Sequence, residues 1–550
     1  MTQCSKCGAP NFQPRVSINV DEIQQQLRSP RFADKASVDA LLRDAEKDFD
    51  DYDAEIARLE TAISVVKHKR RRLEGHVTKY RSLLSPIRRL PPEILSFVFL
   101  LYCQESRNRF DLCDGDISLP AVDLSQVCTS WRQVASNTSS IWSHLYFILG
   151  WDDYHVDNAF SRRFIGLIHP LINLCFERSS QVSLNLSLRL RSFMGNHDLE
   201  SILKTITSTS HRWHSLYVWG ESDSETKVFW SQITELSRLE CFKTDLETLA
   251  WLLGISQDLH RAHRLRWLYF EDDSPELSIT RITAVPLAQI TTLSLSTIGS
   301  SKVFEILRRC INLSALVMSD IRWTHSVGSD FVTLGCLNNL TYNYDDITSL
   351  SEFLSRVTAP ALKQLTFVEL YDSTQSKSVR WPLGVIAEFM TRSSCSLSSF
   401  SIDCTPTTDS ECLSLLRLFP DLRELKIKEK ASSDTSLPYI ITDKLLNGLH
   451  TTRLTSSLFE DESTTSCIPR LQHLSLRVNH HRTVPLAFTP ETLNDMVRSR
   501  WIPDTAYSSE VGIASLRSIK LIGDTRAAEE TPAYNSLREL GKSGLQVEIL

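Results

Sequence analysis

Two cysteines near the N-terminus are the residues with the clearest potential for metal chemistry. Cys4 and Cys7 have the Cys-x-x-Cys spacing of half a zinc site. A structural zinc ion takes four ligands, and no second close pair follows, because His68 and His76 fall within a predicted helix. We therefore expect no metal to be bound here.

Two other polar clusters have a plausible chemistry but a simpler interpretation. The basic run Lys67–Arg72 could be a nuclear import signal or a phosphate-binding patch, although a solvated helix face is the more common role for such a run. The pair His480-His481 stands beside a predicted strand, where a solvated loop pair is more common than a set of metal ligands. We expect neither cluster to form a site.

The familiar motifs of catalysis are missing from the sequence. It has no Walker loop, no G-x-G-x-x-G, no H-E-x-x-H and no G-x-S-x-G. Serine, histidine and aspartate are plentiful, but no spacing singles out a triad. We therefore expect a binding protein that is not an enzyme, with no catalytic residue and no cofactor.

Composition narrows the class of protein further. The chain has 550 residues, 42% hydrophobic and 23% charged, with a net charge of −6 and a pI near 6.2, so nothing in the overall charge favours nucleic acid or anionic membrane. The first 21 residues lack the apolar core of a signal peptide, and no apolar run approaches the roughly 18 residues of a membrane span. The 13 cysteines are then expected to be reduced thiols in the cytoplasm or nucleus.

The most informative segment begins at a short proline-containing motif. Leu90-Pro91-Pro92-Glu93 predicts a helix start, because proline suits the first turn and glutamate suits the positive end of the helix dipole. The ten residues that follow, Ile94 to Cys103, contain one clearly polar residue, Ser96. A helix that is apolar all round must be buried all round, which predicts a docked partner unless the rest of the chain covers it.

This segment resembles an F-box. The residues that carry the resemblance are Leu90-Pro91-Pro92-Glu93-Ile94-Leu95, then Val127-Cys128-Thr129-Ser130-Trp131-Arg132, then Ile141-Trp142. Leu83 to Leu95, where a heptad helix runs directly into the motif, is similar to F-box families of mushroom-forming fungi. The resemblance implies a small three-helix domain that binds the Skp subunit of cullin-based ubiquitin ligases through these residues: Leu90, Pro91, Pro92, Glu93, Leu95, Val127, Cys128 and Trp131.

Three points qualify this assignment. Phe99 is added to the partner-facing set because it lies one helical turn beyond Leu95. For Cys128 and Trp131, packing inside the domain is the alternative role. The polar stretch 104–123 is longer than in a compact F-box, and we expect it to be a surface loop inserted between the first two helices.

A heptad pattern precedes the F-box segment. Apolar residues recur with alternating spacings of four and three, broken only by Arg70: Val38, Leu42, Ala45, Phe49, Tyr52, Ile56, Leu59, Ile63, Val66, Leu73, Val77, Tyr80 and Leu84. This is the a/d pattern of a coiled coil, and a continuous helix of this length would span about 70 Å. The seam could pair with a second copy of the chain, pack on the body of this protein or be buried by a helical hairpin.

The last 400 residues contain a recurring L-x-x-L-x-L pattern. It begins at residues 213, 236, 265, 290, 313, 337, 362, 397, 422, 471 and 516. The early spacings of 23 to 29 residues match leucine-rich repeats, in which each unit contributes a strand and a returning helix. Segments Val303 to Cys310 and Ser410 to Phe419 have the helical spacing of return helices. An ordinary α/β domain with chance matches is the alternative.

The sequence thus predicts an α/β repeat protein in four parts. These are a flexible N-terminus (1–33), a coiled-coil-type helix (34–84), an F-box domain (85–149) and a leucine-rich-repeat-like domain (150–550). The predicted function is substrate recognition in an SCF-type ubiquitin ligase, with Skp and, through it, a cullin at one end and an unknown target protein at the other. A coiled-coil and repeat scaffold that acts without ubiquitin is the alternative.

Overall fold

The computed structural model divides the chain into two compact units, residues 1–95 and 96–550. The residues that it describes are 14–17, 19–29, 34–150, 158–190, 197–220, 231–233, 235–245, 262–271, 285–323, 331–344, 346–370, 381–403, 407–429, 439–451, 467–478, 487–523 and 534–549. Cys4, Cys7, His480 and His481 lie outside these residues.

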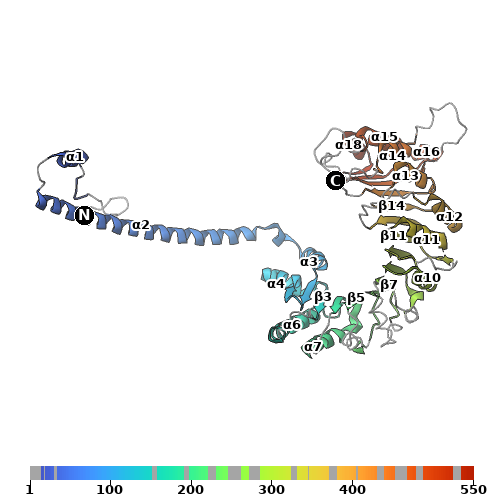
Figure 1. Ribbon diagram of the computed structural model, residues 1–550, viewed down its shortest axis with the longest axis horizontal. Helices are drawn as coiled ribbons and strands as arrows, with labels where there is room; N and C mark the ends of the chain where they lie inside the picture. Colours follow the sequence, from blue (N-terminus) through green and yellow to red (C-terminus); the bar gives the residue numbers. More distant parts are fainter. Residues whose placement is uncertain are drawn as a thin grey trace. The chain divides into compact units, whose positions relative to one another are not determined.

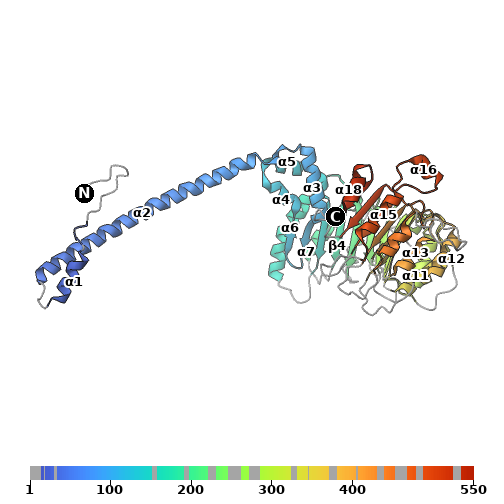
Figure 2. The same ribbon diagram turned by 90° about the horizontal axis from the view of Figure 1, so that it is seen from above.

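The first unit is dominated by one long helix. Its elements are α1 (Val20–Arg28), α2 (Lys35–Leu83) and the 3-10 turn η1 (Pro86–Arg89). The Asp34 side chain accepts a hydrogen bond from the Ala36 N–H and caps α2, and the helix ends before Pro86. Figure 1 and Figure 2 show α2 as a single unbroken helix, so the prediction of a continuous helix is confirmed and a hairpin is excluded.

The apolar seam of α2 is exposed. From Val38 to Leu84, every large apolar side chain of the heptad pattern is at least about a third exposed. The only buried residue of α2 is Asp48, which is polar. Within the first unit, the described residues leave the seam without a cover.

The segment before α2, expected to be flexible, is partly structured. It contains α1, whose cap is the Asn19 side chain. Arg15 forms ion pairs of 2.8 Å with both Asp48 and Asp51 of α2, and the Arg15 and Val16 N–H groups donate to the Asp48 carboxylate. These contacts attach the N-terminal segment to the helix and explain the burial of Asp48.

The second unit is built on a large, mostly parallel sheet whose strands follow one another along the chain. Within the described residues its order is β2-β1-β3-β4-β5-β6-β7-β8-β9-β11-β13-β14-β15-β16-β17-β18, and only the β1–β2 pair is antiparallel. The strands are β1 (Asn108–Asp111), β2 (Asp116–Ser118), β3 (His144–Leu149), β4 (Leu184–Leu190), β5 (Trp213–Gly220), β6 (Cys241–Asp245), β7 (Trp267–Glu271), β8 (Thr292–Ser296), β9 (Ala315–Ser319), β11 (Asn339–Tyr344), β13 (Gln364–Glu369), β14 (Ser399–Asp403), β15 (Glu424–Lys428), β16 (His473–Arg477), β17 (Ser518–Ile522) and β18 (Gln546–Ile549).

One helix precedes the first strand of the sheet, and the others return the chain between strands, as the repeat pattern predicts. They are α3 (Pro92–Ser106), α4 (Pro120–Val127), α5 (Thr129–Asn137), α6 (Asn158–Arg178), α7 (His197–Thr207), α10 (Ser300–Arg309), α11 (Ile347–Arg356), α12 (Leu383–Ser393), α13 (Asp409–Leu416), α14 (Asp443–Leu449), α15 (Pro490–Arg500), α16 (Thr505–Glu510) and α18 (Asn535–Lys542). Short 3-10 turns η2 (Ser139–Trp142), η3 (Ser210–Arg212) and η6 (Leu287–Gln289) and a two-stranded pair, β10 (Val332–Thr333) with β12 (Val357–Thr358), complete the described elements.

The core lies between the sheet and these helices. Strand residues alternate between buried and partly exposed, as in β9, where Leu316 and Met318 are buried and Val317 is not. Tyr342 of β11 is buried, and the centroid of its ring lies 5.4 Å from that of Phe353 on α11. The helices thus cover the face toward which the buried strand residues point (Figure 1), and the other face of the sheet is open.

The predicted pattern locates the eleven sheet strands from β5 to β17, and the register of one of them is shifted. Of the eleven predicted units, ten place their last two apolar positions inside a strand and on its buried side. The exception begins at residue 236: Phe242 and Thr244 point to the core, so the pattern there starts at Leu239, three residues later than predicted.

The segment 104–123 is not the surface loop expected from its polar composition. Its first residues end α3, and it then forms β1 and β2, which join the large sheet through β3. Buried Asn108 holds this segment in place. Its side-chain NH2 donates to the Ile141 carbonyl at 2.9 Å, and its side-chain oxygen accepts from the Ala121 N–H. The sheet therefore begins inside the segment assigned to the F-box, rather than at residue 150.

Arginine side chains join neighbouring repeats; Arg212 and Arg500 are buried, and Arg392 is partly buried. Arg212 donates to the Val182 carbonyl at 2.9 Å, Arg392 to the Val357 carbonyl at 2.8 Å, and Arg500 to the Leu449 and Ile468 carbonyls. Carbonyls near a helix C-terminus lack hydrogen-bond donors within the helix. Arginine N–H groups from the adjacent repeat can act as those donors.

Within the described ranges, no helix combines the length and the apolar character that a membrane crossing requires.

Candidate docking surfaces

Helix α3 presents two opposite apolar faces. Proline in its first turn and Glu93 beside it favour the start of the helix, and the Leu95 N–H donates to the Pro91 carbonyl at 3.0 Å. At about 100° per residue, positions 95, 99 and 103 share one face, positions 94, 97 and 101 lie on the opposite side, and positions 98 and 102 lie at the border between the two.

The first face is buried. Leu95 is 4% exposed, and Phe99 and Cys103 are fully buried. The Phe99 ring lies 4.9 Å from that of Trp131 on α5, in a tilted arrangement typical of aromatic pairs. Burial raises the pKa of Cys103 to about 12, so its thiol stays neutral and packs as a small apolar group. Leu95 and Phe99, expected to face a partner, are core residues of this chain instead.

The second face is an exposed apolar stripe, which we define as Phe97, Val98, Leu101 and Tyr102. Their exposures run from 42% to 57%, and Ile94, one turn earlier on the same helix, is also exposed. Monomeric proteins seldom leave contiguous large apolar side chains in water without a functional reason. The exposed stripe is therefore the part of α3 that can meet a partner.

The remaining residues of the opening motif lie at the surface. Leu90, Pro91, Pro92 and Glu93 are all exposed. They stay available to a partner, as the resemblance implies.

The central motif shapes the junction of α4 and α5. The Cys128 sulfur accepts a hydrogen bond from the Trp131 N–H at 3.5 Å and caps α5. Trp131 is half-buried against Phe99, a contact of the kind expected for its alternative packing role, and Cys128 is half-buried. Val127, at the end of α4, is 61% exposed and remains open to a partner.

Sequence reasoning missed the exposed stripe although the signal for it was present. The all-apolar run Ile94 to Cys103 indicates that two faces are apolar, but it does not say which of them the chain itself covers. The choice depends on Trp131, which is 32 residues from Phe99 in sequence.

The open face of the sheet carries a cluster of aromatic and cationic side chains on β5, β6 and β7. Lys243 places its ammonium 3.8 Å from the ring centroid of Tyr269 and 5.1 Å from that of Trp219. The Tyr217 and Trp219 rings stack at 6.2 Å, and Trp267 is 57% exposed. Burial raises the pKa of Tyr269, and so does the charge of Glu271, which keeps this ring neutral. Tyrosine and tryptophan, which make up most of this cluster, are enriched at protein interfaces.

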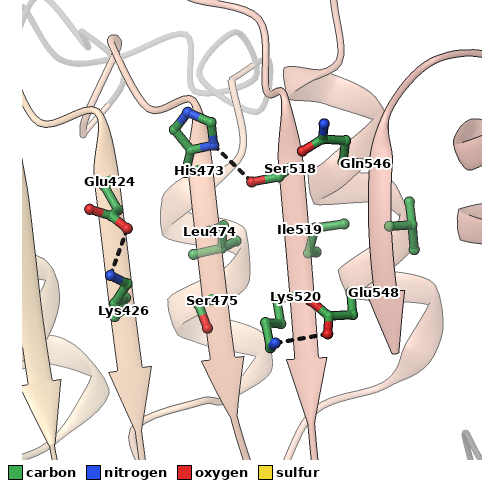
Figure 3. A pocket seen from close by; sticks show the side chains of 11 residues that line it. Glu424, Lys426, His473, Leu474, Ser475, Ser518, Ile519, Lys520, Gln546 and Glu548 are labelled. Atoms are coloured by element: carbon green, nitrogen blue, oxygen red, sulfur yellow. Dashed lines mark hydrogen bonds and ion pairs between the residues drawn. The ribbon is translucent and has the colours of Figure 1, made fainter. Parts of the chain in front are cut away.

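The other end of the open face forms a polar hollow of about 520 Å³ on β15 to β18. Figure 3 shows three interactions across it: Lys426 with Glu424 at 2.7 Å, His473 with Ser518 at 2.8 Å and Lys520 with Glu548 at 2.8 Å. Burial tends to raise the pKa of Glu424, but hydrogen bonds from Lys426 and Ser399, with the charges of Lys426 and His473, lower it overall.

Metal and phosphate sites find no support in the described residues. These contain no group of three or more His, Cys, Asp or Glu side chains placed to hold a metal ion. The basic run Lys67–Arg72 lies exposed along α2, as a solvated helix face would.

The chain has no counterpart in two comparisons with known proteins: no protein-family model matches it, and no curated protein matches it either. The F-box resemblance therefore depends on the motif residues alone.

Proposed function

We propose that the chain is a non-catalytic adaptor of an SCF-type ubiquitin ligase. In this proposal α3, α4 and α5 form an F-box that binds the Skp subunit. The sheet and its return helices are a leucine-rich-repeat-like domain, whose open face binds the target protein. The proposal places the protein in the cytoplasm or nucleus.

The exposed stripe of α3 is the observation that carries the proposal. It follows directly on Leu90-Pro91-Pro92-Glu93, the motif of the resemblance, and it consists of large exposed side chains, of which only Tyr102 carries a polar group, its hydroxyl. A partner that covers it gains about 25 cal/mol for each Å² of apolar surface removed from water. Val127, Leu90 and the two prolines would extend the contact.

The open face of the sheet supports the second half of the proposal. Its side chains sit on a rigid parallel sheet, and the aromatic cluster around Lys243 has the residue types that contribute most to protein interfaces. The chain itself would supply no reacting group. It would hold the target near ubiquitin carried on another subunit, so that proximity raises the rate of transfer.

The test measures Skp binding to the full chain by calorimetry or co-purification. We expect the double variant Phe97→Asp, Leu101→Asp to lose binding by more than 100-fold, because each substitution places a charge in an apolar contact. Ile311→Asp is the matched control: Ile311 is an apolar side chain exposed to 65% after α10, and its change should leave binding intact.

Two results would overturn the proposal. One is a wild-type chain that binds no Skp, and the other is a stripe variant that binds as well as the Ile311 control. Either result would favour the alternative function, a scaffold that acts through α2 and the repeat domain without ubiquitin.

A further inference from the structure

The exposed seam of α2 carries an inference that is independent of the F-box. Counted as heptads, Leu42, Phe49, Ile56, Ile63, Arg70, Val77 and Leu84 occupy the a positions. The d positions are Val38, Ala45, Tyr52, Leu59, Val66, Leu73 and Tyr80. A seam of this kind is completed by another helix with the same spacing, and a second copy of α2 has it.

Charge is divided unevenly along α2. Residues 35–60 contain nine acidic and four basic side chains, and residues 61–83 contain one acidic and seven basic. One end of the helix is thus strongly negative and the other strongly positive. Arg15 offsets part of the negative end by pairing with Asp48 and Asp51, but most of its acidic residues remain.

A parallel pair would place like charges together. Each a position would face its own copy, so that Arg70 would meet a second Arg70 inside the seam. At the flanks, position g of one helix lies beside position e of the next heptad of the other, which would bring Glu55 beside Glu60. Only Lys69 beside Glu74 would be a favourable flanking pair.

An antiparallel pair places opposite charges together. The register that overlaps the two seams, Val38 to Leu84 in each copy, most fully sets a against d, with paired residue numbers that add up to 122. Phe49 then meets Leu73 of the second copy, and Leu59 meets Ile63. At the flanks Asp53 lies near Lys67 and Asp39 near Arg81. Glu46 near Glu74 and Glu60 near its own copy are the pairs of like charge.

The same register accounts for Arg70, the one charged residue in the seam. Its counterpart in the second copy is Tyr52, whose ring can accept the guanidinium in a cation–π contact. Arg70 now pairs with Glu74 at 3.0 Å, but both side chains are exposed, so this ion pair holds it weakly. We propose that α2 forms an antiparallel coiled coil with a second copy of this chain, with Arg70 of each copy packed on Tyr52 of the other.

The first experiment measures mass and orientation on the full chain. Light scattering should give twice the chain mass of 62.6 kDa. Spin labels on a non-canonical amino acid at position 64 should lie close to their own copy. Labels at position 37 should be about 70 Å apart, at 1.5 Å of helix per residue. Two short distances would indicate a parallel pair, and a monomer mass would exclude any pair; either result overturns the proposal.

A residue swap tests the register. Tyr52→Arg alone places two arginines face to face in the antiparallel pair, and we expect the dimer to weaken at least tenfold. Adding Arg70→Tyr restores a tyrosine opposite each arginine and should recover most of the affinity. In a parallel pair the double variant would also recover, because it has one arginine pair, as the wild type would, so the spin-label distances decide the orientation. Failure of the rescue would refute the register, whether or not the chain binds Skp.

Discussion

The exposed stripe of α3 and the polar hollow on β15 to β18 are both open surfaces, but they are open for different reasons. The stripe exposes Phe97, Val98 and Leu101, whose side chains have no polar atoms. In the hollow, the charged groups already bind one another, as Lys520 binds Glu548 at 2.8 Å (Figure 3). The charged groups of the hollow have partners in each other and in water, whereas the apolar side chains of the stripe gain nothing from contact with water.

Because of this difference, the stripe suits a constitutive contact and the hollow suits a selective one. Covering the stripe releases water from apolar area and needs no exact geometry, so any well-shaped apolar partner gains from it. A ligand in the hollow must replace ion pairs that already exist, so only a partner with matching charges can bind. Within the proposed adaptor, the stripe suits an invariant subunit, and the sheet face suits a chosen target.

The largest expected effect comes from comparing the two faces of α3 through a matched pair. Phe99→Ala should lower the free energy of unfolding by about 3–5 kcal/mol, because it opens a cavity against Trp131. Phe97→Ala, the same substitution on the exposed face, should change it by under about 0.5 kcal/mol. Urea denaturation of both variants measures the difference.

Equal losses of stability in the two variants would contradict the two-faced helix. They would mean that Phe97 is also covered by the chain itself, and the stripe would then have no free surface for a partner.

The next largest effect is a loss of stability in the repeats that carry the hollow. Arg500 is fully buried, and burial lowers its pKa to about 10. Its hydrogen bonds to the Leu449 and Ile468 carbonyls hold α15 against the preceding repeat. Arg500→Met keeps most of the volume but leaves these carbonyls unpaired, and we expect a loss of about 2–3 kcal/mol.

Hydrogen exchange on the Arg500→Met variant provides the measurement. Faster exchange should be confined to α14, α15 and strands β15 to β17. An even increase from β3 onward would instead show that the repeats unfold as one unit, and that this arginine has no local role.

The sequence was sufficient for the sheet strands from β5 to β17, apart from the register of β6, and insufficient for β1 to β4, for β18 and for the contacts between repeats. Alternation in β9 predicts its strand because Leu316 and Met318 repeat with the period of a sheet. At β6, Leu236-Leu239-Cys241 and Leu239-Phe242-Thr244 match the pattern almost equally, and packing selects the second. The roles of Asn108 and Arg500 could not be predicted, because their partners lie 13 to 51 residues away and share no local pattern.

For the candidate site, the sequence predicted the helix, and the assignment of its two faces remains a prediction. Leu95 was assigned to the partner because the resemblance places it there, and Phe99 because it lies one helical turn beyond Leu95; both are buried in this chain. Their burial follows from Trp131, which no periodicity within α3 reveals.

The smallest expected effect is electrostatic and belongs to the hollow. Glu424 accepts hydrogen bonds from Ser399 at 2.8 Å and pairs with Lys426, and its pKa is lowered in the folded chain. A lowered carboxyl pKa stabilises the fold above the unfolded value of about 4.3. That contribution is lost as the pH falls through the folded pKa. Since the pair is partly exposed, Glu424→Gln should cost under about 1 kcal/mol at pH 7.

Denaturation of the wild type and the Glu424→Gln variant between pH 7 and pH 3 checks this sign. The two stabilities should converge as the carboxyl group takes up its proton in both states. High salt at pH 7 should also reduce the difference, because screening weakens partly exposed ion pairs. A difference that stays constant with pH and salt would mean that Glu424 acts through packing. The charged groups of the hollow would then not be a self-satisfied network, and the contrast with the apolar stripe of α3 would fail at this residue.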